Sequence, residues 1–129
     1  MRRPAEPVLS PEERALFEKG VREFNTGFFF ECHDTLEELW AGVRGDGRDF
    51  IQGLIQTSVA FYHLGRGNAA GALSMLERAL ARFDKYPGRY FGFDLDAHRR
   101  LLQDWVRSAR AGETEPPLDS VPKWRFDPP

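Results

Sequence analysis

Cysteine and long apolar runs are scarce in this chain of 129 residues. The single cysteine, Cys32, cannot form a disulfide within the chain, and an absence of disulfides is typical of proteins in reducing compartments. No stretch approaches the roughly 18 apolar residues of a transmembrane helix, and the first residues lack the apolar centre of a signal peptide. These absences predict a cytoplasmic protein that does not have a membrane as its partner.

Concentrated charge of one sign is missing as well. The formal net charge is −2, and no block of five or six like charges occurs along the chain. Nucleic acids and anionic membranes attract clustered positive charge, so neither is expected as a partner. The Walker, GxGxxG, GxSxG and HExxH motifs are also absent. Nucleotide-dependent chemistry is therefore disfavoured.

Strand signals are few, because β-branched residues are sparse and no segment alternates apolar and polar residues for long. Apolar residues recur at the helical spacing instead. The clearest helix start is Ser10-Pro11-Glu12-Glu13, which has a capping hydroxyl, a proline at the first helical position and a glutamate three residues after the cap. The pattern predicts five helices, over about 11–24, 28–42, 48–65, 68–85 and 94–111.

A weak internal repeat with an offset of 40 residues relates the first two helices to the next two. Gly27 aligns with Gly67, and Leu36 aligns with Leu76. Each copy has the order helix, glycine-containing turn, helix, and it resembles a tetratricopeptide-type hairpin. The sequence therefore predicts an all-α fold: a compact bundle of about five helices, made of two antiparallel helical hairpins plus a capping helix.

The same pattern predicts a single domain over residues 1–129. Its core is expected to span about 10–111, and the proline-rich stretch 112–129 is expected to form an irregular C-terminal tail. Two aromatic residues of this tail, Trp124 and Phe126, are expected to pack back onto the helices.

One face of the second predicted helix combines polar and aromatic groups. At about 100° per residue, His33, Glu37 and Trp40 fall within a narrow arc. An imidazole and a carboxylate one turn apart can supply two metal ligands, or can act as a base and its orienting group. They can equally form a simple ion pair on the helix surface, which contributes a few tenths of a kcal/mol.

The third predicted helix carries a polar stripe on an otherwise apolar sequence. Gln52, Gln56 and His63 lie within about 40° of one another. Buried amides and imidazoles need hydrogen-bond partners. The expected partners, across an antiparallel contact with the second helix, are Glu31, His33 and Glu37. The convergence predicts either a ligand site or a buried polar network that fixes the register of the two helices.

Three other polar residue types have simpler interpretations. Arg44 and Arg48 flank the loop between the second and third helices, where they are expected to pair with nearby carboxylates or to receive an anionic ligand. Cys32 is expected to be a packed thiol rather than a nucleophile. His98 stands beside two arginines and is expected on the surface.

Two motifs stand in order along the chain: Phe24-Asn25-x-Gly27-x-Phe29-Phe30-Glu31-x-His33-x3-Glu37-x2-Trp40 and Phe50-x-Gln52-Gly53-x2-Gln56-x6-His63-x3-Gly67-Asn68. In these motifs the chain resembles the domain-of-unknown-function family numbered 309, over about residues 16–80 and again at 90–94. Cys32 is a visible departure, since a small residue such as alanine is more usual there.

The resemblance implies a small all-helical cytoplasmic protein of bacterial or archaeal type. It implies no activity, because the function of the family is itself unestablished. The defining polar positions of the family fall on Glu31, His33, Glu37, Gln52, Gln56 and His63.

Two hypotheses of function follow. The first is a small-ligand or divalent-metal site between the second and third helices, with hydrolysis as one chemistry it could support. Its candidate catalytic groups and metal ligands are His33, Glu37 and His63. Its candidate ligand-binding groups are Glu31, Gln52, Gln56, Arg44 and Arg48. The second hypothesis is a non-enzymatic helical module that binds a protein partner or self-associates, in which the polar residues form a structural network. The sequence leaves open whether the protein is an enzyme.

Overall fold

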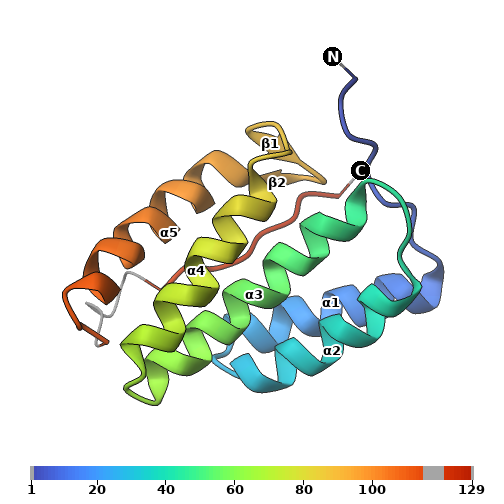
Figure 1. Ribbon diagram of the computed structural model, residues 1–129. Coiled ribbons are helices and arrows are strands. Elements are labelled where there is room, and N and C mark those ends of the chain that lie inside the picture. Colours follow the sequence, from blue (N-terminus) through green and yellow to red (C-terminus); the bar gives the residue numbers. More distant parts are fainter. Residues whose placement is uncertain (1, 115–120, 129) are drawn as a thin grey trace.

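The computed structural model describes residues 2–114 and 121–128, and its architecture is all-helical, as predicted (Figure 1). Each helix end lies within two residues of the predicted position. The helices are α1 (Pro11–Asn25), α2 (Phe29–Gly42), α3 (Gly47–Gly65), α4 (Ala69–Phe83) and α5 (Leu95–Arg110).

Side-chain caps account for several helix starts. Ser10 accepts a hydrogen bond from the Glu13 backbone N–H, and the Glu13 side chain accepts one from the Ser10 N–H, which completes the predicted capping box. Asn68 caps α4 and Asp94 caps α5 in the same way, by accepting a backbone N–H three residues further on.

Each helix packs against the next one along the chain, from α1 to α5. The turns of the two helical hairpins are alike: Gly27 and Gly67, the aligned glycines of the internal repeat, both have positive φ, at +85° and +71°. Close approach within the second hairpin depends on another glycine. A Cβ atom at Gly53 of α3 would lie 2.5 Å from the ring of Phe83 on α4.

A short antiparallel pair of strands, β1 (Arg89–Tyr90) and β2 (Phe93–Asp94), lies between α4 and α5. The sequence did not predict it, because strands of two residues are too short to show an alternating pattern. Tyr90 of this hairpin is fully buried, and its ring centroid lies 4.9 Å from that of Phe50 on α3. The hairpin therefore completes one end of the core.

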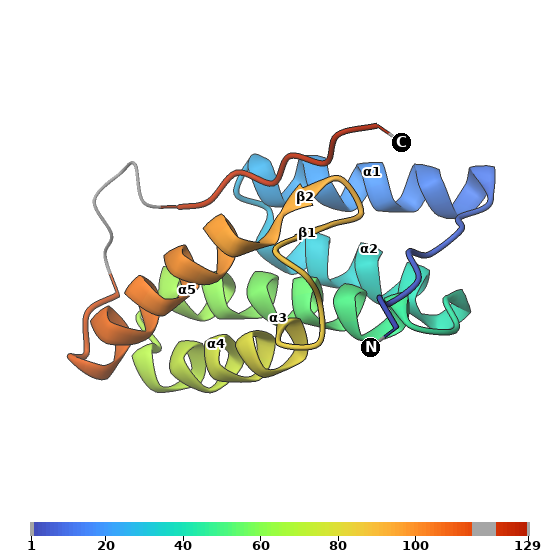
Figure 2. The same cartoon turned by 90° about the horizontal axis from the view of Figure 1, so that it is seen from above.

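Residues 121–128 of the predicted tail return along the helices, as predicted for Trp124 and Phe126, whereas 115–120 and 129 lie outside the described residues. The Trp124 ring is stacked on Phe24 of α1 with 3.8 Å between centroids, and Phe126 is stacked on Phe93 at 4.5 Å. Asn25 fixes the backbone of this segment, since its amide donates to the Trp124 carbonyl and its carbonyl oxygen accepts from the Trp124 N–H. Figure 2 shows the C-terminal segment running beside α1 and past the strands.

The prediction for His98 is wrong. His98 is buried, with 5% of its surface exposed, and its ring lies between those of Phe83 and Phe93 at centroid distances of 5.5 and 5.1 Å. Burial, with a smaller contribution from the neighbouring Arg99, lowers the pKa of His98 to about 3. The adjacent arginines misled the prediction, although His98 stands three residues after the buried Leu95, on the apolar stripe of α5.

Candidate functional site

His33 on α2 stands between two carboxylates. Its Nε2 atom lies 3.1 Å from Oε1 of Glu37, one helical turn further on, and its Nδ1 atom lies 3.3 Å from Oδ1 of Asp34. The histidine side chain is 24% exposed, whereas those of Asp34 and Glu37 are 62% and 55% exposed. The imidazole thus lies at the surface with both ring nitrogens facing an acid.

In the described part of the chain, these three side chains form the one group of three or more histidine, cysteine or acidic residues whose ligand atoms lie close enough together to hold a metal ion. One ligand atom from each lies within 4.8 Å of the other two. His33 and Glu37 are predicted site residues. The sequence analysis missed Asp34, since a residue next to His33 does not share its helical face. The sequence offered one indication that Asp34 belongs to the cluster, which is its position directly after His33.

Two nitrogen atoms on this side of α2 are buried and make no hydrogen bond to described residues: Nδ1 of His33 and Nε1 of Trp40. The Asp34 oxygen is close to Nδ1, but the contact is an ion pair without hydrogen-bond geometry. A buried polar atom without a partner is rare in folded proteins. The fold therefore keeps these two polar groups buried here, although their missing hydrogen bonds lower its stability.

The two loop arginines bind backbone carbonyls at the end of α2. Arg48 donates to the carbonyl oxygens of Trp40 and Val43 at 2.9 and 2.8 Å, and its guanidinium lies 3.6 Å from the centroid of the Trp40 ring system. Arg44 donates to the carbonyls of Ala41 and Val43. Within the described residues neither forms an ion pair with a carboxylate. Their observed contacts are those of a helix C-terminal cap.

The polar stripe of α3 faces away from this cluster. Gln56 is buried at 7% exposure and lines a pocket with residues of α4. His63 lies at the turn into α4, where its Nδ1 atom is 3.3 Å from Nδ2 of Asn68. Among the described residues, the stripe makes no hydrogen bond to Glu31, His33 or Glu37. Gln52 is half-buried and Glu31 is exposed, and neither makes a side-chain hydrogen bond within that part of the chain.

Aromatic rings connect the His33 cluster to α3. The ring of Phe30 lies 5.8 Å from that of His33 and 5.5 Å from that of Tyr62 on α3. Phe30 and Phe28 remain 48% and 56% exposed. The cluster consequently has an apolar border that is open to solvent.

Cys32 is a packed thiol, as predicted. It is completely buried, and burial raises its pKa to about 12 against a smaller opposing effect of the Ser58 hydroxyl. A thiol held in its protonated form is a poor nucleophile, so Cys32 does not belong to a reactive site.

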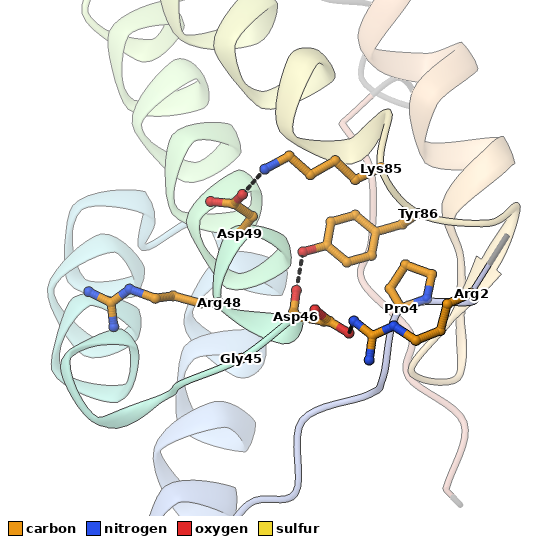
Figure 3. Close-up of a pocket in the computed structure, with 8 residues that line it drawn as sticks. All are labelled: Arg2, Pro4, Gly45, Asp46, Arg48, Asp49, Lys85 and Tyr86. Carbon is orange, nitrogen blue, oxygen red and sulfur yellow. Dashed lines mark hydrogen bonds and ion pairs between the residues drawn. The ribbon is translucent and has the colours of Figure 1, made fainter.

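A pocket of about 320 Å³ lies elsewhere, beside the loop that enters α3 (Figure 3). The Tyr86 hydroxyl donates to the Asp46 carbonyl, and the Arg2 guanidinium binds the Asp46 carboxylate at 2.8 Å. Arg48 points away from Tyr86 in this view. Burial raises the pKa of Tyr86 to about 12, so its hydroxyl stays protonated. These polar groups bind one another and fix the N-terminal segment to the loop.

Comparison with known proteins confirms the predicted family resemblance. Residues 17–75 match the model of the family described as domain of unknown function (DUF309). The matched stretch runs from α1 into α4, and it includes the His33 cluster and the polar stripe of α3.

Two relatives are themselves uncharacterised. The chain is 26% identical over 101 residues to an uncharacterised protein of Aquifex aeolicus (strain VF5), which covers 78% of this chain and 30% of that protein. It is 36% identical over 76 residues to the uncharacterised protein YpuF of Bacillus subtilis (strain 168), which covers 58% of this chain and 43% of that protein. The chain thus spans less than half the length of these relatives.

A membrane span requires a helix of sufficient length and apolar character. No helix among the described residues is both long and apolar enough to cross a bilayer.

Proposed function

We propose that this protein binds a divalent metal ion at the His33 cluster, with Nε2 of His33 and a carboxylate oxygen of Glu37 as ligands. The observation that carries the proposal is the 3.1 Å approach of these two atoms at the protein surface. A neutral imidazole and a carboxylate on successive turns of one helix are ligands that zinc and manganese accept.

Asp34 supports this assignment from the other side of the imidazole. Histidines that bind a metal through one ring nitrogen commonly donate the N–H of the other nitrogen to a carboxylate, which fixes the tautomer and the orientation of the ring. Oδ1 of Asp34 lies 3.3 Å from Nδ1 of His33. A slight rotation of the ring or the carboxylate would turn this ion pair into that hydrogen bond.

A metal ion held by two side chains keeps open positions for water. Such an ion can act as a Lewis acid, and it lowers the pKa of a bound water molecule toward neutrality. The proposed site is thus suited to hydrolysis of a small substrate that reaches the exposed face of α2. His63, the third predicted ligand, is not part of the group whose ligand atoms lie within 4.8 Å of one another.

Calorimetric titration of the metal-stripped protein with Zn²⁺ and with Mn²⁺ tests the proposal. We expect saturable binding by the native chain, and about 10-fold or greater loss of affinity in His33→Gln and in Glu37→Gln, because each variant removes one of two protein ligands. Glu38→Gln is the matched control, since Glu38 is exposed on the same helix outside the cluster. The native chain should also melt at a higher temperature in saturating metal.

Two results would contradict the metal site: no binding of either ion, or equal binding by His33→Gln and the native chain. The variant His63→Gln adds a separate answer. Unchanged affinity in that variant would agree with a two-residue site, whereas a loss as large as that of His33→Gln would restore the three-ligand set predicted from the sequence.

The exposed phenylalanines favour a second candidate function, a helical module that self-associates. Phe28 and Phe30 lie at the turn into α2 and expose about half of their surface, which is unusual for two large apolar side chains in one short segment. A second copy of the chain would cover them at an interface related by two-fold symmetry.

Light scattering over a range of protein concentrations tests self-association. We expect the mass of a dimer at high concentration for the native chain and that of a monomer for Phe28→Ser. Val8→Ser is the control, because Val8 is 96% exposed on a different segment. A native chain that stays monomeric throughout, or a Phe28→Ser variant that still dimerises, would eliminate this candidate.

A further inference from the structure

A second polar pocket lies between α3 and α4, outside the His33 cluster. It has a volume of about 420 Å³ and is lined by Gln56 of α3 and by Arg78, Ala81, Arg82 and Lys85 from the α4 side. Its volume is within the range of small-molecule sites. No residue of the proposed metal site lines it.

Gln56 is the most unusual residue of this pocket. Its side chain is more than nine-tenths buried, yet its Oε1 atom accepts no hydrogen bond from any described residue. A buried amide oxygen without a donor costs about 1–3 kcal/mol. Gln56 lines the pocket, and a rotation of its side-chain amide would turn the buried Oε1 atom toward the pocket, where a hydroxyl or N–H group of a ligand could donate to it.

The rest of the pocket is cationic. Arg82 and Lys85 both bind the Asp49 carboxylate, the former at 2.7 Å, and the hydrogen bond from Lys85 holds the pKa of Asp49 below its usual range. Arg78 is exposed and forms no ion pair among the described residues. The lining holds three cations, and Asp49 is the one carboxylate that pairs with any of them among the described residues, so the pocket keeps an excess of positive charge.

We infer that this pocket binds a small organic anion, one that carries a hydroxyl or N–H group next to its phosphate or carboxylate. The oxyanion would be bound by the Arg78 guanidinium and by the free donors of Arg82, since arginine recognises oxyanions through paired N–H groups. After rotation of the Gln56 amide, the neighbouring hydroxyl or N–H of the ligand would donate to Oε1. The inference does not depend on the proposed metal site, because the two share no residue.

Three probes with a three-carbon skeleton test the chemistry: glycerol 3-phosphate, glycerate and propyl phosphate, each titrated into the ¹⁵N-labelled full chain at constant ionic strength. We expect saturable shifts of backbone amide signals near the pocket with glycerol 3-phosphate, with glycerate, or with both. The comparison of these two shows whether phosphate or carboxylate is preferred. Propyl phosphate, which lacks the hydroxyl groups, should bind more weakly.

Two variants assign the binding to the pocket. Arg78→Gln should weaken the better probe about 10-fold, whereas Arg100→Gln, which removes an exposed arginine of α5, should leave the affinity unchanged. Gln56→Leu should fold normally, because it removes a buried atom without a partner, and it should abolish the preference for the hydroxyl-bearing phosphate.

Three results would overturn the inference. The first is an absence of saturable shifts with all probes, and the second is an equal loss of affinity in Arg78→Gln and Arg100→Gln. The third applies if the phosphates bind, and it is an equal affinity of the native chain for glycerol 3-phosphate and propyl phosphate. Because none of the probes contains a metal ion, these outcomes are separate from those of the metal titration.

Discussion

The free energy of unfolding should fall steeply as the pH drops from about 6.5 toward 3, and His98 should be a main cause. The folded state holds the pKa of His98 at about 3, while the unfolded chain binds a proton near 6.5. Below pH 6.5 the unfolded state thus binds more protons, so stability rises with pH in this range and is independent of His98 above it. At about 1.4 kcal/mol per pH unit, the loss reaches roughly 5 kcal/mol near pH 3.

Urea unfolding at pH values from 4 to 8 measures this effect in the native chain and in His98→Leu. Leucine is apolar and cannot be protonated, so the difference in unfolding free energy between the two proteins should move in favour of the variant as the pH decreases. His63→Gln is the control, because His63 is only partly buried and its variant should keep the pH dependence of the native chain. A difference between native chain and His98→Leu that stays constant from pH 8 to 4 would contradict the prediction.

Replacement of Trp124 by alanine should destabilise the protein by about 3–5 kcal/mol, which is the usual cost of removing a buried tryptophan. Trp124 is 2% exposed and stacked on Phe24, and its loss would leave a cavity over α1. The hydrogen bonds between Asn25 and the Trp124 backbone do not involve the indole ring, so they would remain in Trp124→Ala. They would not replace the packing energy that is lost with the ring.

The same urea titration at neutral pH measures the effect of Trp124→Ala. Arg125→Ala is the control, since the Arg125 side chain is 90% exposed and should matter by less than about 0.5 kcal/mol. A loss below about 1 kcal/mol for Trp124→Ala would mean that the tail does not contribute to the core in solution. Fluorescence during unfolding offers a second check in the variant Trp40→Phe/Trp105→Phe, where Trp124 is the one remaining tryptophan. Its signal should change together with the loss of helix if the tail unfolds cooperatively with the bundle.

The helices were predictable because their signals are local. The cap at Ser10 and the apolar spacing within each segment are properties of short stretches of sequence, and they locate the helix ends. The β1–β2 hairpin was not predictable in this way. Its two-residue strands depend on contacts with distant residues, such as the packing of Tyr90 against Phe50.

The candidate site was predictable only in part, for the same reason. His33 and Glu37 meet because they are four residues apart on one helix, which the sequence states directly. Gln56 could be placed on the polar stripe of α3, but its position beside α4 rather than α2 depends on how α3 is rotated between its two neighbours. Periodicity gives the relative angles of residues within a helix and leaves that rotation undetermined.

Because the C-terminal segment is synthesised last, the first helix of the protein receives part of its cover only at the end of translation. Trp124 and Phe126 cover Phe24 and Phe17 of the first helix, yet the ribosome makes them after all five helices. The two hairpins can pair while the chain is still growing, because their partners are neighbours in sequence. The two phenylalanines of α1 also contact earlier segments, at Phe29, Phe61 and Phe91, but they lack their full cover until the last segment emerges. Until then, that face of the nascent protein exposes apolar surface that can aggregate or be bound by a chaperone.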